Sequence, residues 1–277
     1  MMDVKSQKNI DQSPRILKKK SSFLFEYFRH LWYPFFFILA VWFGYSLLVV
    51  EMDWSRIATP TQGLKTILRF FPPNLSFILT LLKPTIETFM IAVLGTVLAI
   101  LFTIPVSWFA ARNITPYFPI TYPIGRLIMT ISRSVHEIVW GLIFVAALGL
   151  GPLPGIMAIG IRSIGFLSKL TAEEIENVNL GPIEAIEATG ASKAQVILYG
   201  IIPQVLNLFI GNVIFQWDIN IRRATIIGLV GAGGIGIVFT IQMVMYQYRN
   251  ATATIVAIMI LVMLGEYVSN RLRMKFI

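Results

Sequence analysis

The stretch Gly181-Pro-Ile-Glu-Ala-Ile-Glu-Ala-Thr-Gly190-Ala-Ser-Lys-Ala-Gln-Val-Ile-Leu-Tyr-Gly-Ile-Ile-Pro203 is the polar exception in a very apolar chain. Pro182 suits the first position of a helix, because its φ is preset and it has no N–H to satisfy. Gly190 suits the end of that helix, because glycine readily takes the left-handed conformation. Ser192 and Gln195 have the spacing of a capping box, which starts a second helix. The stretch therefore predicts a short helix, a glycine elbow and a second helix that enters the membrane near Pro203.

Composition points to a protein that crosses the membrane several times. Of 277 residues, 56% are hydrophobic and only 13% are charged, with a mean hydropathy of +0.73. Soluble domains carry roughly a quarter charged residues. The net charge of +9 is then best explained by lysines and arginines in cytoplasmic loops. No nucleic-acid partner is expected.

The polar stretch resembles the cytoplasmic coupling loop of ABC importer permeases. In that family the pattern is Glu-Ala-Ala, three residues, Gly, nine residues, Ile-x-Leu-Pro. Glu184, Ala185, Gly190 and Pro203 stand in register with it, whereas Ile186 replaces the second alanine. The resemblance implies that the ATPase is contacted by Glu184, Ala185, Glu187, Ala188, Gly190, Ala191 and Ser192. An ordinary surface loop between two spans is the other interpretation.

Charged and apolar stretches predict how the chain crosses the membrane. Residues 1–31 are a cytoplasmic tail, because Lys18-Lys19-Lys20 precede the first apolar run and positive residues stay inside. Residues 32–50 form an anchor that stays uncleaved, since no small-residue cleavage site follows. Residues 51–84 are extracytoplasmic, with Leu68–Phe71 lying along the membrane face. Within a transmembrane domain of residues 85–270, spans are predicted at about 85–110, 154–171, 197–220 and 251–269, and residues 271–277 form a cytoplasmic tail.

The apolar stretch from Tyr117 to Leu150 is too long for one span and contains Arg126 and Arg133. One interpretation is an interfacial helix at the inner surface followed by a span from about Val135 to Leu148. The other is a single long bent helix. Composition leaves both open.

Three further stretches carry a second resemblance. They are Ser132-Arg-Ser-Val-His-Glu-Ile-Val-Trp140 with Gly149-Leu-Gly-Pro152, Ile161-Arg-Ser-Ile-Gly165, and the stretch from Ile219 to Gly236. Together they resemble the permeases of phosphonate and phosphite importers. The resemblance implies an all-α integral membrane protein with about six transmembrane helices and the type I ABC importer permease fold, which moves phosphonate, phosphite or hypophosphite by alternating access. Methionine importer permeases share the glycine-rich segment, so a methionine-type or other small-solute importer stays open.

The same resemblance implies partners and a location. The expected partners are a cytoplasmic ATPase dimer, a second permease copy (homodimer or paralogous pair) and an extracytoplasmic substrate-binding protein. The expected location is the bacterial inner membrane, with the amino terminus in the cytoplasm. The chain has no G-x-x-x-x-G-K-[ST] loop, so ATP and Mg²⁺ are expected on the partner ATPase and no cofactor, metal or catalytic site is expected here.

Charged residues within the spans are candidates for the substrate path. Arg162 falls near the middle of the fourth span, where an unpaired charge is costly. It either contacts a phosphonate or phosphite oxygen, whose geometry suits a guanidinium, or forms an internal ion pair with Glu137 or Asp218. Arg222 and Arg223 either line the outer mouth or extend to lipid headgroups.

Three further candidates lie around the start of the span predicted from about Val135 to Leu148. Arg133 is also explained by the positive-inside pattern. His136 and Glu137 form either a proton relay or a hydrogen-bonded pair at a helix start.

Gly231-Ala-Gly-Gly-Ile-Gly236 satisfies the G-x-G-x-x-G fingerprint, but that fingerprint needs a βαβ context that is not visible here. The glycines are better explained by close helix packing or a re-entrant backbone. A secondary transporter is disfavoured because no duplicated interrupted helices are evident, and a membrane hydrolase because its motifs are missing.

Overall fold

The computed structural model describes residues 32–47, 49 and 60–276, and every element in this part of the chain is helical. The chain divides into two units, residues 1–64 and 65–277. The predicted tail 1–31 lies outside the described residues, and the predicted anchor appears as an apolar helix, Trp32–Leu47. From Pro60 onwards the elements are α2 (Pro60–Leu68), the 3₁₀ helix η2 (Leu75–Leu81), α3 (Leu82–Ala110), α4 (Phe118–Ser134), α5 (Glu137–Leu148), α6 (Pro152–Glu176), α7 (Leu180–Ala188), α8 (Lys193–Val196), the π-helix η3 (Ile197–Ile201), α9 (Ile202–Ile227), the 3₁₀ helix η4 (Gly228–Val230), α10 (Ile235–Val244) and α11 (Tyr248–Phe276).

Four helical runs in the described residues are long and apolar enough to cross a membrane. They are Leu75–Ala110, Pro152–Glu176, Lys193–Val230 and Tyr248–Lys275. The shortest, α6, has 25 residues and is about 38 Å long at 1.5 Å per residue, more than the roughly 30 Å of a hydrocarbon core. The bent pair α4 and α5 counts as a fifth span. With the shorter helix Trp32–Leu47 added, the total agrees with the predicted count of about six.

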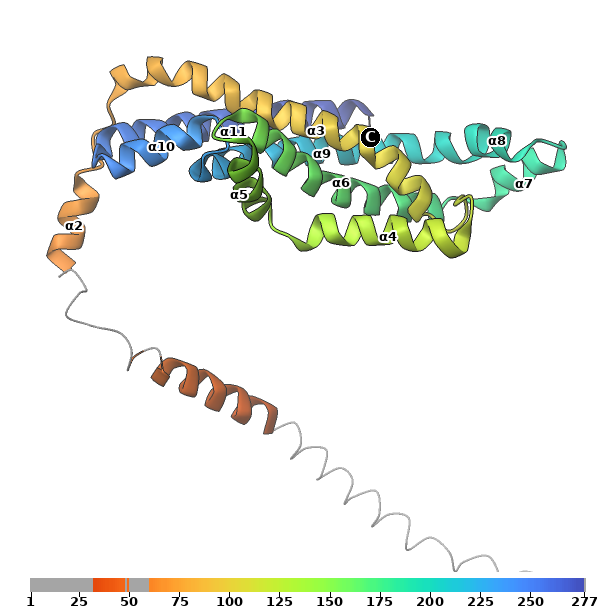
Figure 1. The fold of residues 1–277 in the computed structure, drawn as a ribbon, viewed down its shortest axis with the longest axis horizontal. Coiled ribbons are helices and arrows are strands. Elements are labelled where there is room, and N and C mark those ends of the chain that lie inside the picture. Colours follow the sequence, from red (N-terminus) through yellow and green to blue (C-terminus); the bar gives the residue numbers. More distant parts are fainter. Residues whose placement is uncertain (1–31, 48, 50–59, 277) are drawn as a thin grey trace, which may run out of the picture. The chain divides into compact units, whose positions relative to one another are not determined.

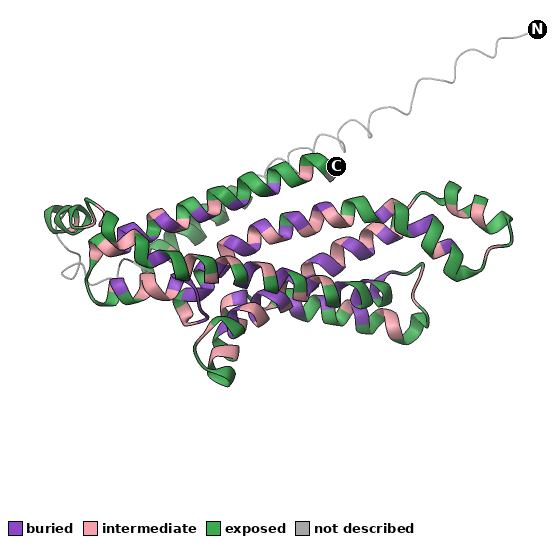
Figure 2. Cartoon of the chain, turned by 90° about the horizontal axis from the view of Figure 1, so that it is seen from above, coloured by how far each residue is buried: buried purple, intermediate pink, exposed green. Residues whose placement is uncertain are grey.

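The core lies where α3, α6 and α9 pack together (Figure 1). Figure 2 shows buried residues gathered on the facing sides of the long helices, with exposed residues on their outer sides. Small residues permit the close approach: a Cβ at Gly95 of α3 would lie 3.0 Å from Ile159 Cγ2 of α6. The loop with α7 and α8 forms one end of this bundle, here called the coupling end. The junction of α10 and α11 lies at the opposite end, here called the distal end.

In Tyr117–Leu150 the structure has two helices, α4 and α5, joined at a sharp bend. α4 and α5 are bent by 89° because Val135 is extended and His136 caps α5. α4 runs along α3 and α6, and a Cβ at Gly125 would lie only 2.8 Å from Ala110 N of α3. α5 has 12 residues, about 18 Å, and is too short to form the predicted span alone.

Arg126 joins α4 to the end of α6. Its Nη2 donates to Glu176 Oε1 of α6 at 2.8 Å, and its Nε donates to the Ala110 carbonyl at 3.1 Å. Nearby, Arg112 Nε donates to the Tyr122 hydroxyl at 2.9 Å, and this hydrogen bond raises the pKa of Arg112 above its ordinary value. These contacts join the turn between α3 and α4 to the end of α6.

The helix–elbow–helix prediction for 181–203 is confirmed. Gly190 has φ +82 and separates α7 from α8, and Ser192 and Gln195 form the capping box. The first helix begins at Leu180, two residues before Pro182, because the Asn179 side chain accepts the Gly181 N–H at 3.0 Å. α8 passes through η3 into α9 without a break, so the second helix enters the bundle as predicted.

The glycine-rich segment serves close packing, as the sequence predicts. Gly231, Gly233 and Gly234 have positive φ and turn the chain from η4 into α10. A Cβ at Gly233 would lie 2.7 Å from Pro152 Cα, and one at Gly155 would lie 2.4 Å from the Ala232 carbonyl oxygen. The turn therefore fits against the amino end of α6 with no room for side chains.

Several predicted boundaries shift. The second spanning run begins at Leu75, ten residues before the predicted start at 85. The amphipathic piece expected at Leu68–Phe71 is a turn that follows α2, and the tail expected at 271–277 continues α11 to Phe276. The sequence reasoning did not foresee α10.

Candidate functional site

The candidate site is an ion cluster around Glu137, the first residue of α5. Its carboxylate lies 3.4 Å from Arg162 Nε of α6 and 3.4 Å from Arg223 Nε of α9. The Glu137 side chain is 7% exposed, and the side chains of Arg162 and Arg223 are 24% and 20% exposed. One buried carboxylate therefore faces two arginines from different helices. Arg162 thus has the ion-pair partner that the sequence left as one of its two interpretations.

Asp218 belongs to a neighbouring pair. It lies one turn from Arg222 on α9, and the two form an i,i+4 ion pair. Asp218 is buried, whereas Arg222 is partly exposed. Glu137 with its two arginines and Asp218 with Arg222 together place three guanidinium groups beside two carboxylates, which leaves an excess of positive charge.

The bend between α4 and α5 brings two more predicted residues to this cluster. The Arg133 carbonyl accepts a hydrogen bond from Arg162 Nη1, while the Arg133 side chain is exposed. His136 Nδ1 accepts the Ile138 N–H at 3.4 Å, and its Nε2 lies 3.8 Å from Glu137 Oε2. His136 therefore caps the start of α5, but it contacts Glu137 at ion-pair distance and does not form the hydrogen-bonded pair with it that was one of the two interpretations.

Some buried atoms of the cluster have no hydrogen-bond partner among the described residues. They include Arg162 Nε and Arg223 Nη1, and the acceptors Glu137 Oε2 and Asp218 Oδ1. A buried polar group without a hydrogen bond is costly. Guanidinium N–H groups suit an anionic oxygen.

A second polar network crosses the core between α3, α6 and α9. Asn220 Nδ2 donates to Thr96 Oγ1 at 2.9 Å, and Ser163 Oγ donates to Asn220 Oδ1 at 3.1 Å. Gln216 Nε2 donates to Ser163 Oγ at 2.9 Å. Sequence reasoning missed these residues, and Thr96 and Asn220 are 124 positions apart, so no local pattern connects them.

The predicted ATPase-contact residues lie on the exposed side of the coupling loop. Glu184, Ala185, Glu187 and Ala188 of α7 are exposed, as are Gly190 and Ser192, while Ala191 is half-buried. The opposite side of α7 faces η3: a Cβ at Gly200 would lie 3.3 Å from Ile183 Cγ1 and 3.5 Å from Ile186 Cδ1. Ile186, which departs from the family pattern, therefore faces a glycine that gives it room.

The coupling loop is braced against the bundle. Gln204 Oε1 accepts the Asn179 N–H at 3.0 Å, and Gln204 Nε2 donates to the Asn179 carbonyl at 3.2 Å. The Gln204 side chain on α9 thereby fixes the start of α7. Together with the continuous run from α8 into α9, this ties both helices of the loop to one spanning helix.

Spanning helices, an exposed two-helix loop at one end and a cationic cluster within the spans define an integral membrane transport subunit. Residues 103–273 match the family described as "Binding-protein-dependent transport system inner membrane component", and the chain belongs to this family. It is a multi-pass inner membrane permease of an ABC importer.

Relatives with curated names support this assignment. The chain is 35% identical over 240 residues to the phosphite transport system permease protein PtxC of Stutzerimonas stutzeri, which covers 86% of this chain and 85% of that one. It is 39% identical over 168 residues to the phosphate-import permease protein PhnE of Mycolicibacterium smegmatis, covering 61% of this chain and 31% of that one. It is 27% identical over 161 residues to a probable D-methionine transport system permease protein MetI of Haemophilus influenzae, covering 55% and 76%.

A solved structure shares the fold. An inward-facing MetNI methionine ABC transporter superposes with a TM-score of 0.61 at 20% identity, over 74% of this chain and 99% of that one. The type I importer permease fold expected from the sequence is therefore confirmed.

Proposed function

We propose that this permease carries phosphite- or phosphonate-type oxyanions and that Arg162 and Arg223 lie on their path. The observation that carries the proposal is the cluster of three guanidinium groups around two carboxylates within the spans. Its unpaired guanidinium N–H groups offer hydrogen bonds to phosphorus oxyanions. PtxC, the phosphite permease relative, supports the same substrate class.

In this proposal the complete transporter contains a second permease copy, a cytoplasmic ATPase dimer that binds ATP and Mg²⁺, and an extracytoplasmic substrate-binding protein. The exposed residues of α7 and its elbow dock on the ATPase. The amino terminus of the chain lies in the cytoplasm, on the same side as the coupling loop.

Helix α9 is the mechanical link in this proposal. The continuous run Lys193–Val230 carries the second coupling helix at one end and Arg222 and Arg223 near the other. From Ile202 to Arg223 a helix rises about 32 Å. A shift of the coupling loop therefore moves Arg223 relative to Glu137 on α5, and this changes which guanidinium groups are free to meet an anion.

The test is uptake of radiolabelled phosphite by membranes that contain the complete transporter. Arg162→Ala should lower uptake roughly tenfold or more, because a charge-assisted hydrogen bond contributes about 1.5–3 kcal/mol. Co-purification with the ATPase should stay intact. Arg271→Ala, at an exposed arginine near the end of α11, is the matched control. Unchanged uptake kinetics in Arg162→Ala would remove Arg162 from the path.

A methionine-type permease is the second candidate, because the MetI relative and the MetNI structure share this fold. Competition separates the two. Excess phosphite should suppress labelled phosphite uptake, whereas methionine should not. Saturable methionine uptake that phosphite does not affect would favour the second candidate.

A further inference from the structure

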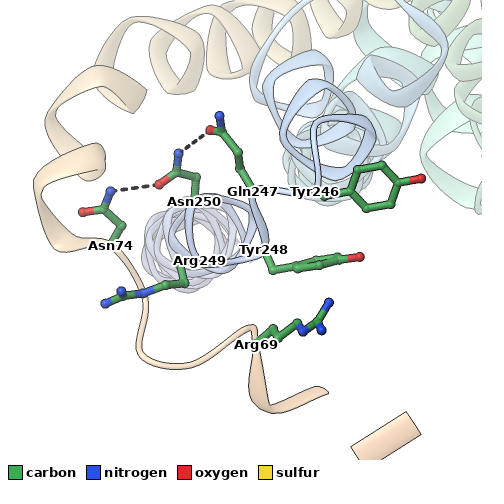
Figure 3. A pocket seen from close by; sticks show the side chains of 7 residues that line it. All are labelled: Arg69, Asn74, Tyr246, Gln247, Tyr248, Arg249 and Asn250. Atoms are coloured by element: carbon green, nitrogen blue, oxygen red, sulfur yellow. Dashed lines mark hydrogen bonds between the residues drawn. The ribbon is translucent and has the colours of Figure 1, made fainter. Parts of the chain in front are cut away.

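A pocket of about 510 Å³ lies at the distal end of the bundle, and no residue of the ion cluster lines it. Figure 3 shows the side chains of its lining residues. The pocket forms where the turn after α2 and the start of η2 meet the junction of α10 and α11. The lining residues are Arg69, Asn74, Tyr246, Gln247, Tyr248, Arg249 and Asn250. Two guanidinium groups, two phenols and three amides line it, and no carboxylate does.

Three donor side chains of this pocket have no partner among the described residues. The Arg69 guanidinium makes no hydrogen bond or ion pair with the described residues, and neither do the hydroxyls of Tyr246 and Tyr248. Figure 3 shows the side chains of Arg69, Tyr246 and Tyr248 extending to the same side of the α11 start. A guanidinium beside two phenols provides hydrogen-bond donors without an opposing negative charge.

The backbone of Tyr246 has a costly conformation. Tyr246 has φ 58, the left-handed region, and it is the one residue other than glycine with positive φ in the described part of the chain. A bulky side chain is uncommon there, and such strain persists where the surroundings enforce it. Tyr248 is held by Phe70, whose ring centroid lies 4.9 Å away.

Amide hydrogen bonds fix the rest of the wall. Asn74 Nδ2 donates to Asn250 Oδ1 at 2.9 Å, and Asn250 Nδ2 donates to Gln247 Oε1 at 2.8 Å (Figure 3). Arg249 Nε donates to the Pro72 carbonyl at 2.9 Å. The segment before α3 and the first turn of α11 are therefore locked together, so the pocket is organised before any ligand arrives.

The position of the pocket limits its ligand. Spanning-length runs begin beside it at Leu75 and Tyr248, so it lies at one boundary of the apolar layer. Phosphate groups of lipids lie at this depth, and soluble anions reach it from the water. α11 begins at Tyr248 in the wall of the pocket, so the positive end of its helix dipole adds to the field there.

We propose that Arg69, Tyr246 and Tyr248 bind a phosphate-type oxyanion at the distal end of the permease. The anion is either the phosphate of a phospholipid headgroup or a free phosphorus oxyanion approaching the translocation path. The second source rests on the proposed function, whereas the first does not.

The experiment has two arms on the purified full-length chain in phospholipid-free detergent. In the first, phosphatidylglycerol is added and bound lipid is counted by native mass spectrometry. In the second, binding of labelled phosphite is measured by equilibrium dialysis. Arg69→Ala should weaken binding roughly tenfold to a hundredfold in the arm that matches the source, because it removes a charge-assisted hydrogen bond.

Tyr246→Phe removes one hydroxyl and should weaken the same arm by a smaller factor. Arg271→Ala, an arginine that stacks on Tyr267 near the other end of α11, is the matched control and should bind as the original chain does. Equal binding by the original chain and Arg69→Ala in both arms, or no binding in either arm, would overturn the proposal. Neither result depends on uptake, so the proposed function is tested separately by Arg162→Ala.

Discussion

Glu137→Gln is the sharpest perturbation of the ion cluster, because it keeps the shape of the side chain and removes its charge. In the native protein the carboxylate lies 3.4 Å from both Arg162 Nε and Arg223 Nε and is 7% exposed. The variant leaves two largely buried guanidinium groups facing a neutral amide.

The cost follows from this burial. Removing one partner of a buried ion pair destabilises a protein by about 3–5 kcal/mol, because the remaining charge has no counter-ion. Arg162→Gln should cost less, about 1.5–3 kcal/mol, since Glu137 keeps Arg223 as its partner. The double variant should be more stable than the sum of the two losses by about 0.5–3 kcal/mol, because the second change removes one stranded cation.

The assay is thermal unfolding of the detergent-solubilised chain, followed by tryptophan fluorescence at one scan rate. At about 2–4 °C per kcal/mol, Glu137→Gln should lower the midpoint by roughly 10 °C. Glu184→Gln, on the exposed face of α7, should leave it unchanged. If the effects of Glu137→Gln and Arg162→Gln simply add in the double variant, the two residues are not coupled and the cluster is not the unit described here.

Three further changes test other parts of the structure. Gly190→Val forces a β-branched residue to φ +82, at a cost of about 1–2 kcal/mol, and should reduce co-purification with the ATPase while lowering the melting midpoint by at most about 8 °C; normal co-purification would contradict the role of the elbow. Asn220→Leu removes the hydrogen bonds to Thr96 and Ser163 and should lower the free energy of unfolding by about 1–3 kcal/mol, seen as a lower melting midpoint. An unchanged midpoint would show that the network is not stabilising. Gly155→Val places a side chain against the Ala232 carbonyl, only 2.4 Å from the Cβ position, and should prevent normal folding, as judged by monodisperse yield in detergent; Gly181→Ala, where the nearest atom lies at 3.5 Å, should be tolerated, and equal yields of the two variants would refute the packing argument.

Local chemistry explains which parts of the fold the sequence predicted well. The elbow at Gly190 and the capping box of Ser192 and Gln195 depend on neighbours within a few residues. Long apolar runs such as α6 and α11 are equally local signals. The i,i+4 spacing of Asp218 and Arg222 is another local signal, and it indicates their ion pair on α9.

Tertiary contacts determine the features that the sequence did not predict. The bend before α5 depends on His136 capping one helix while α4 packs along α3 and α6, and composition alone does not distinguish this from a continuous helix. Glu137 was expected as a partner of Arg162, but its sharing with Arg223 brings together residues 86 positions apart on α5 and α9. The sequence therefore offered Glu137 as one of two possible partners of Arg162, while its second contact with Arg223 was available only from the fold.

The π-helix Ile197–Ile201 sets the rotation of the coupling loop about the axis of α9. Ile202 N–H bonds to the Ile197 carbonyl, five residues back, so this turn holds one residue more than an α-turn would. Because one residue corresponds to about 100° in an α-helix, deleting one residue here would restore regular α-helix and swing α7 and its exposed glutamates to a different side of the spanning helix. The length of this single turn therefore fixes the side of α9 on which α7 lies, and with it the face that would meet the proposed ATPase.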